Sequence, residues 1–112
     1  MQGLNLAAGM KQAKALLEAG FEASALVVAW AVIEAALREL AAREKVTFNV
    51  QSSPAQLIKN LAFLGLIAEK DYDSVWNAMK LRNGIVHGFE AEGDFKQTIQ
   101  QLFLISSKIA KI

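Results

Sequence analysis

The sequence predicts a small all-α protein, a compact bundle of about five helices around a single core. Apolar residues make up 54% of the chain and recur at helical spacing. There is a single proline, and the glycines stand mostly between the helical patterns, which disfavours a turn-rich β fold. A length of 112 residues accommodates one domain, residues 1–112, with a sizeable core.

The first two helical patterns are separated by Gly20. Apolar residues recur through the segment from Leu4 to Ala19, at Leu4, Ala7, Ala8, Ala15, Leu16 and Leu17. Because glycine accepts a left-handed conformation at little cost, we expect the first helix to end before Gly20. A second helix is expected from about Glu22 to Glu44. Its first half is apolar nearly all round, which is typical of a buried central helix.

The third helix is predicted by its start signal. Lys45 to Ser52 is expected to be a connection with some strand character, too short and isolated to form a sheet. Ser53 is then a suitable N-cap and Pro54 a suitable first helical residue. We expect this helix to end near Gly65.

Two further helices complete the predicted bundle. The fourth begins around Glu69, and its inward stripe is expected to contain Tyr72, Val75, Trp76, Met79 and Val86. Asp94, with Gln97 three residues later, predicts the cap of a last helix that runs almost to Ile112. That helix has apolar residues on more than one side, including Leu104 and Ile105. We therefore expect it to pack against more than one neighbour, including a second chain.

Composition excludes several classes of function. The net charge is +1, so any nucleic-acid site has to be a local patch. With no cysteine and one histidine, the chain offers neither a disulfide framework nor a convincing metal site, and we expect no cofactor. The N-terminus does not resemble a signal peptide, and the longest apolar run falls far short of a membrane span. We expect a soluble, cytoplasmic protein.

The most informative stretch is residues 80–88, KLRNGIVHG. Arg82 and Asn83 follow Met79 by three and four residues, so they continue the inward stripe of the fourth helix. His87 follows Asn83 by four residues and shares its face. Polar side chains thus occupy positions of the stripe where apolar ones are expected. They need hydrogen-bond partners, since burying a polar group without one costs several kcal/mol.

A purely structural interpretation is favoured by this spacing alone. Arg82 can pair with Glu34, the charged residue in the apolar half of the second helix, and Glu34 can instead pair with Arg38. Asn83 and Gly84 can form a C-cap or an ordinary turn, and a histidine at a helix end is more often a structural hydrogen-bonding group than a catalyst. The two tryptophans, Trp30 and Trp76, lie on apolar stripes and are assigned to the core before any base-stacking role.

A family resemblance changes this balance. The stretch from Arg82 to His87 resembles the signature of the HEPN domains (higher eukaryotes and prokaryotes nucleotide-binding): an arginine, a polar residue, a short spacer and a histidine. The resemblance extends over nearly the whole chain, including residues 26–34 (LVVAWAVIE) in a long early helix, with the motif near the end of a late helix.

The resemblance implies a helical bundle, usually a symmetric dimer, and in many members a metal-independent RNase. Arg82 and His87 would then be the catalytic pair and Asn83 the supporting polar residue. Beyond the resemblance, Lys80 and Gly84 are candidate RNA contacts if two copies meet at this helix end, and Glu34 is a possible supporting residue that holds the Arg82 guanidinium. Cleavage by the 2′-hydroxyl of RNA needs a proton acceptor near neutral pH, a role that suits histidine. It also needs a fixed cation on the phosphate, a role that suits arginine.

Helical geometry predicts two chains. Positions 82 and 87 are five residues, or about 140°, apart on a regular helix and do not converge. Two copies that meet at these helix ends about a two-fold axis place both pairs in one cleft. The resemblance further implies a toxin or defence role and a nucleotidyltransferase-type antitoxin partner. The alternatives are a catalytically inactive HEPN-like module that binds nucleotide, RNA or protein, and a purely structural helical dimer.

Overall fold

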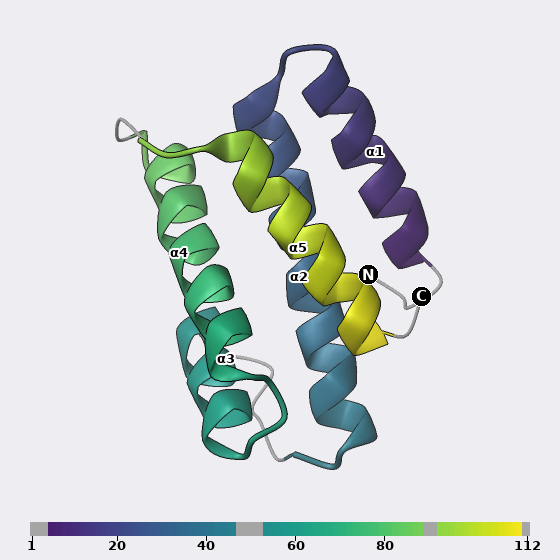
Figure 1. Ribbon diagram of the computed structural model, residues 1–112, viewed down its shortest axis with the longest axis vertical. Coiled ribbons are helices and arrows are strands. Elements are labelled where there is room, and N and C mark those ends of the chain that lie inside the picture. The colour runs from purple at the N-terminus through teal and green to yellow at the C-terminus, as the bar shows by residue number, and fades with distance from the viewer. Residues whose placement is uncertain (1–4, 47–52, 89–91, 111–112) are drawn as a thin grey trace.

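Five helices make up the part of the chain that the computed structural model describes, residues 5–46, 53–88 and 92–110 (Figure 1). No strand occurs among these residues, so the all-α prediction is confirmed. The helices are α1 (Leu6–Glu18), α2 (Glu22–Arg43), α3 (Pro54–Phe63), α4 (Glu69–Val86) and α5 (Phe95–Ala110).

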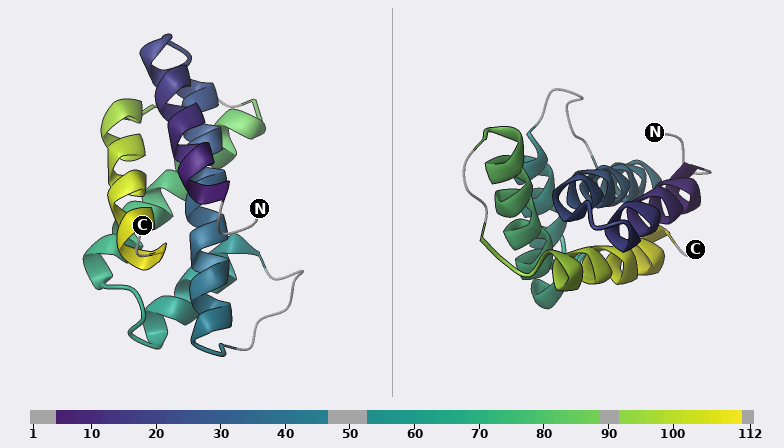
Figure 2. Two further views of the ribbon diagram at one scale, coloured as in Figure 1. Left: turned by 90° about the vertical axis from the view of Figure 1, so that its right-hand side faces the viewer. Right: turned by 90° about the horizontal axis from the view of Figure 1, so that it is seen from above.

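Helix α2 is the centre of the bundle and contacts all four other helices. Its most extensive contacts are with α1 and α5, so that α1, α2 and α5 form one three-helix group. Helices α3 and α4 form a hairpin that lies against the side of this group, as the view from above in Figure 2 shows. The predicted central position of the second helix is confirmed, since Leu26, Trp30 and Ile33 are at most 2% exposed.

Helices α1 and α3 end as the sequence predicts. At the end of α1 the Phe21 N–H donates to the Leu16 carbonyl (2.9 Å), and Gly20 has a φ of 89°. The end of α3 repeats this arrangement with a φ of 73° at Gly65. This pattern, known as the Schellman motif, needs a left-handed residue after the helix, and glycine adopts that conformation without strain.

The two predicted N-terminal caps are also present. The Gln56 N–H donates to Ser53 Oγ (3.2 Å) at the start of α3, and the Gln97 N–H donates to Asp94 Oδ1 (3.0 Å) at the start of α5. Each bond satisfies one of the backbone donors that a helix leaves unpaired in its first turn.

The Ser53 cap is expected to contribute measurably to stability. Ser53→Ala removes the acceptor of the Gln56 N–H and should lower the free energy of unfolding by about 1 kcal/mol. The measurement is urea denaturation followed by circular dichroism. Ser74→Ala is the matched control: the Ser74 hydroxyl bonds only the Lys70 carbonyl one turn earlier within α4, and its loss should change stability by less than about 0.5 kcal/mol. Equal effects of the two substitutions would contradict the capping role.

The buried face of α1 differs from the apolar pattern of the sequence. Leu6, Gly9 and Ala13 are buried, whereas Ala7, Ala8 and Ala15 are exposed. Alanine is tolerated on either face of a helix, so its position indicates orientation only weakly. The small residues Gly9 and Ala13 instead mark the face on which α1 approaches its neighbour. Leu4 and residues 47–52 of the predicted connection lie outside the described residues.

The inward stripe of α4 is confirmed only in part. Val75 and Met79 are buried and Tyr72 and Trp76 are half-buried, but Val86 is 46% exposed, so its predicted inward position is wrong. Periodicity gives the direction of a helix face but not how far along the helix its neighbours extend.

Helix α5 packs on both α2 and α4, which confirms more than one neighbour within the chain. Ile105 is buried, whereas Leu104 is 73% exposed. The end of α5 is held from two sides: Arg43 Nη2 donates to the Ile109 carbonyl (2.9 Å), and Lys108 forms an ion pair with Asp71. Within the described segments, no helix is long and apolar enough to cross a membrane.

Candidate functional site

Helix α4 carries the HEPN-like motif in its last turns without a break. It continues through Asn83 and Gly84 to Val86, and His87 is the C-cap, with its backbone N–H donating to the Asn83 carbonyl (3.0 Å). The interpretation of Asn83 and Gly84 as a turn is therefore wrong. The motif is a helix end with three polar side chains at fixed angles around one axis.

Arg82 continues the buried stripe of α4, as the sequence predicts. It follows the buried residues Ala78 and Met79 by four and three positions, and its side chain is half-buried. Its Nε atom is buried, and none of the residues that the structure describes supplies it with a hydrogen-bond acceptor. A buried donor without an acceptor costs about 1–3 kcal/mol. At the end of α4, the Nε–H group of Arg82 can therefore donate a hydrogen bond for which the described residues supply no acceptor.

Asn83 holds the guanidinium of Arg82. The Nη1 atom of Arg82 donates to Asn83 Oδ1 over 3.0 Å. Adjacent positions on a helix point about 100° apart, so this bond turns the end of the arginine away from the inner stripe and toward the face of Asn83. The exposed residue His87 lies four positions after Asn83, on that same face. Asn83 therefore reduces the divergence between Arg82 and His87.

The structure does not bring Glu34 to Arg82. The described residues contain no ion pair between the two. Glu34 lies half-buried on α2 and lines a surface hollow together with Arg38, one turn later. Of the two partners predicted for Glu34, the described residues therefore show no direct contact with Arg82.

Lys80 lies one turn before Gly84 of the motif. Both line a hollow between α4 and the segment before α5, with Glu92 and Thr98 on its other side. The ammonium of Lys80 is exposed, and the carboxylate of Glu92 offsets its charge within the hollow. A single chain therefore presents only a weakly basic surface at this position.

Two side-chain interactions near the motif do not follow from the sequence. One is the bond between the adjacent residues Arg82 and Asn83, which spacing rules for helix faces do not anticipate. The other joins two helices: Lys59 of α3 lies over the ring of Trp76 of α4, with Nζ 5.2 Å from the ring centroid. No local pattern in the sequence signals either contact.

The arrangement suits acid–base chemistry on a phosphate ester. It combines the part-buried, permanently charged guanidinium of Arg82 with the solvent-exposed side chain of His87. Across the described segments, no three side chains of the metal-binding types lie close enough together to hold an ion.

Comparisons with known proteins give no match. No protein-family model fits the chain, and neither a characterised protein nor a solved structure shows significant similarity to it. The resemblance to the HEPN domains rests on the motif and the helical layout, and it stays a prediction.

Proposed function

We propose that this protein is a metal-independent endoribonuclease of the HEPN type. The observation that supports the proposal is the state of Arg82: its guanidinium is part-buried and oriented by Asn83, and its buried Nε donor has no acceptor among the described residues. A non-bridging oxygen of a phosphodiester supplies the missing acceptor, and the fork of arginine suits phosphate oxygens. A purely structural arginine in this position would be expected to bond its Nε atom as well as its Nη1 atom.

The proposed reaction is transesterification by the 2′-hydroxyl of the RNA. His87 takes the proton of that hydroxyl as its oxygen bonds to phosphorus, and the bond from phosphorus to the 5′-oxygen breaks. The 5′-oxygen receives a proton from an imidazolium. Arg82 stabilises the charge that builds up on the phosphorane-like transition state. The products are a 2′,3′-cyclic phosphate and a 5′-hydroxyl.

The active form is proposed to be a homodimer. Within one helix, Arg82 and His87 diverge by about 140° at the backbone, and Asn83 compensates for only part of this angle. Two copies about a two-fold axis supply two histidines, so that one can accept a proton while the other donates one. They also double Lys80 and Arg82, which gives a nearly neutral chain a local basic cleft.

The biological role follows from the resemblance alone. HEPN-like RNases of this kind act as toxins or in defence, within the cytoplasm, and a nucleotidyltransferase-type antitoxin holds many of them in check. We propose the same setting here. Relief of growth arrest by His87→Ala would support it, whereas equal toxicity of variant and wild type would contradict it.

The decisive experiment is RNA cleavage in excess EDTA. We expect the wild-type protein to cleave mixed RNA and leave cyclic phosphate ends, and His87→Ala to lose this activity while keeping the wild-type circular dichroism spectrum. Cleavage that EDTA abolishes would contradict a metal-independent reaction. No cleavage at concentrations at which the protein is shown to be dimeric would refute the nuclease. The catalytically inactive binding module would then be the better account of the Arg82 site.

A further inference from the structure

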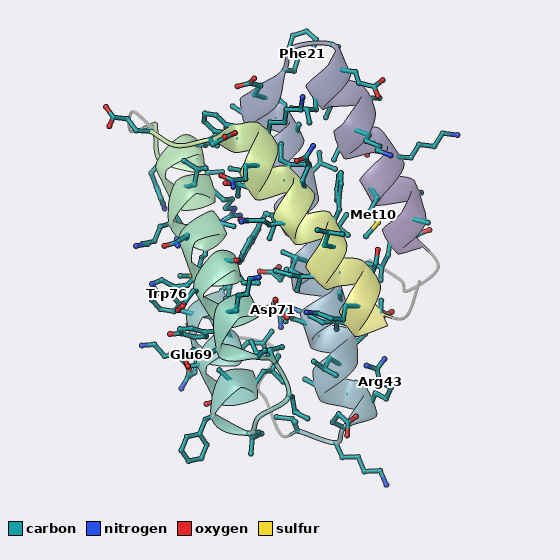
Figure 3. The ribbon with its side chains drawn as sticks, viewed as in Figure 1. Met10, Phe21, Arg43, Glu69, Asp71 and Trp76 are labelled. Carbon is teal, nitrogen blue, oxygen red and sulfur yellow. The ribbon has the colours of Figure 1, made fainter. Side chains whose placement is uncertain are left out.

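Two aromatic side chains lie at the surface of α4, outside the proposed catalytic residues. The rings of Tyr72 and Trp76 stack with their centroids 5.7 Å apart and an angle of 22° between their planes. Both side chains are half-buried, in contrast to Trp30, which is 2% exposed. Figure 3 shows Trp76 on the outer side of α4, away from α5. The assignment of Trp76 to the core therefore accounts for only part of its surface.

This aromatic pair lies on the same helix face as the motif. Asn83 and His87 follow Trp76 by seven and eleven residues, which are close to two and three full turns of an α-helix. The corresponding rises are about 10 and 16 Å. The exposed residue Lys80 lies between them. Tyr72, Trp76, Lys80, Asn83 and His87 thus form one continuous strip along α4, called the α4 strip below.

A cation from another helix completes the aromatic end of the α4 strip. The Nζ atom of Lys59 lies 5.2 Å from the centroid of the Trp76 ring. Lys59 is exposed on α3, so its ammonium can move aside without unfolding any element. An aromatic surface next to a mobile cation is the combination with which proteins bind single-stranded nucleic acid: the ring stacks on a base and the cation contacts a phosphate.

We infer that Trp76 is a stacking site for one base of a single-stranded RNA substrate, with Lys59 bound to a neighbouring phosphate, a few nucleotides from the bond that is cleaved. This inference rests on the proposed nuclease function. It adds a substrate class, because bases paired within a duplex do not offer their faces to a tryptophan. Glu69 and Asp73, exposed in the first turns of α4, repel phosphates and limit the path of the strand at that end. The strand therefore leaves α4 near Trp76 in the direction of Lys59.

Tryptophan fluorescence tests the inference directly. The probe is a single-stranded uridine oligonucleotide with 2′-O-methyl riboses, which the proposed reaction cannot cleave. Binding should quench the emission of Trp76 saturably, while the buried Trp30 supplies a constant background. Trp76→Leu should lose the quench and weaken binding about tenfold, the effect of one stacked base. Phe63→Leu is the matched control, since Phe63 is a 90% exposed aromatic residue off the α4 strip, and it should bind like the wild type.

An abasic oligonucleotide separates stacking from a structural role. If Trp76 stacks on a base, removing the bases should weaken wild-type binding to the level of Trp76→Leu and should affect that variant no further. Lys59→Ala should lower the slope of log affinity against log salt by about 0.7, the loss of one phosphate contact on a single strand. Equal weakening of both oligonucleotides by Trp76→Leu, or bound RNA with no change in Trp76 emission, would overturn the inference.

Other outcomes distinguish this inference from the proposed function. RNA cleavage that Trp76→Leu leaves unchanged would overturn the stacking site and leave the nuclease intact. Absence of both binding and cleavage would overturn both. Emission that depends on protein concentration rather than on RNA would place Trp76 between two copies of the chain and overturn the RNA contact. If Trp76→Leu does not fold, the quench of wild-type Trp76 emission and the oligonucleotide affinity of Trp76→Phe still test whether residue 76 stacks on a base.

Discussion

Replacing Arg82 by methionine is expected to abolish RNA cleavage and, at the same time, to stabilise the fold. Cleavage should fall at least about 100-fold, because the phosphate loses its fixed cation. The free energy of unfolding should rise by about 1 kcal/mol, because a buried Nε donor that finds no acceptor in the described part of the chain is replaced by a flexible apolar chain of similar length. Single-turnover cleavage assays and urea denaturation measure the two effects.

Arg82→Lys is the control that separates charge from geometry. Lysine keeps the positive charge but lacks the guanidinium fork, which donates to the side-chain oxygen of Asn83 and which, in the proposed reaction, would contact two phosphate oxygens. We expect most of the cleavage to be lost and stability to stay near that of the wild type. A large loss of stability in Arg82→Met would contradict the proposal, since it would mean that the arginine is there to hold the fold together.

Leu26→Ala is expected to cause a large loss of stability. Leu26 is fully buried at 0% exposure in the central helix α2, and its removal leaves a cavity that costs about 2–5 kcal/mol. The free energy of unfolding of a small domain is about 5–15 kcal/mol in total, so this variant approaches the limit of folding at ambient temperature. Thermal unfolding monitored by circular dichroism provides the measurement.

The same truncation on the surface serves as its control. Leu104 of α5 is 73% exposed, and Leu104→Ala should change the free energy of unfolding by less than about 0.5 kcal/mol. Dimerisation through α5 would change this result: a clear, concentration-dependent destabilisation of Leu104→Ala would mean that a second chain covers the residue.

Much of the fold is predictable from the sequence because its helix ends are encoded locally. Ser53 caps α3 and Asp94 caps α5 through hydrogen bonds that span only three residues, and Gly20 closes α1 within one turn. Such signals depend on nothing outside their own segment. They therefore divide the chain correctly into five helices before any packing is known.

The orientation of α1 could not be predicted in the same way. Its alanines give no strong preference for either face, and the structure buries Gly9 and Ala13 while it exposes Ala7 and Ala8. The choice depends on which face lets α1 approach α2 most closely, which is a property of the pair of helices. The exposure of Val86 has a similar origin, since it depends on where the neighbouring helices end.

The candidate site likewise has some features that the sequence predicts and others that depend on how the chain packs. The positions of Arg82 and His87 on one helix end follow from their spacing. The hydrogen bond from Arg82 to Asn83 depends on how a long side chain bends, and the contact of Lys59 with Trp76 depends on how α3 packs against α4. Interactions of this second kind lie between segments that are distant or unaligned in the sequence, and only the folded chain places them together.

The attachment of the α3–α4 hairpin has a consequence for how the molecule opens. The packing among α1, α2 and α5 is far more extensive than the packing of either hairpin helix against them. Amide groups in α3 and α4 can therefore exchange with solvent through a partial opening that leaves the three-helix group intact. The helix that carries Arg82 and His87 thus belongs to the cooperative unit of lower stability. It can adjust to a bound strand at a free-energy cost below that of global unfolding, whereas α2 keeps its place until the whole domain unfolds.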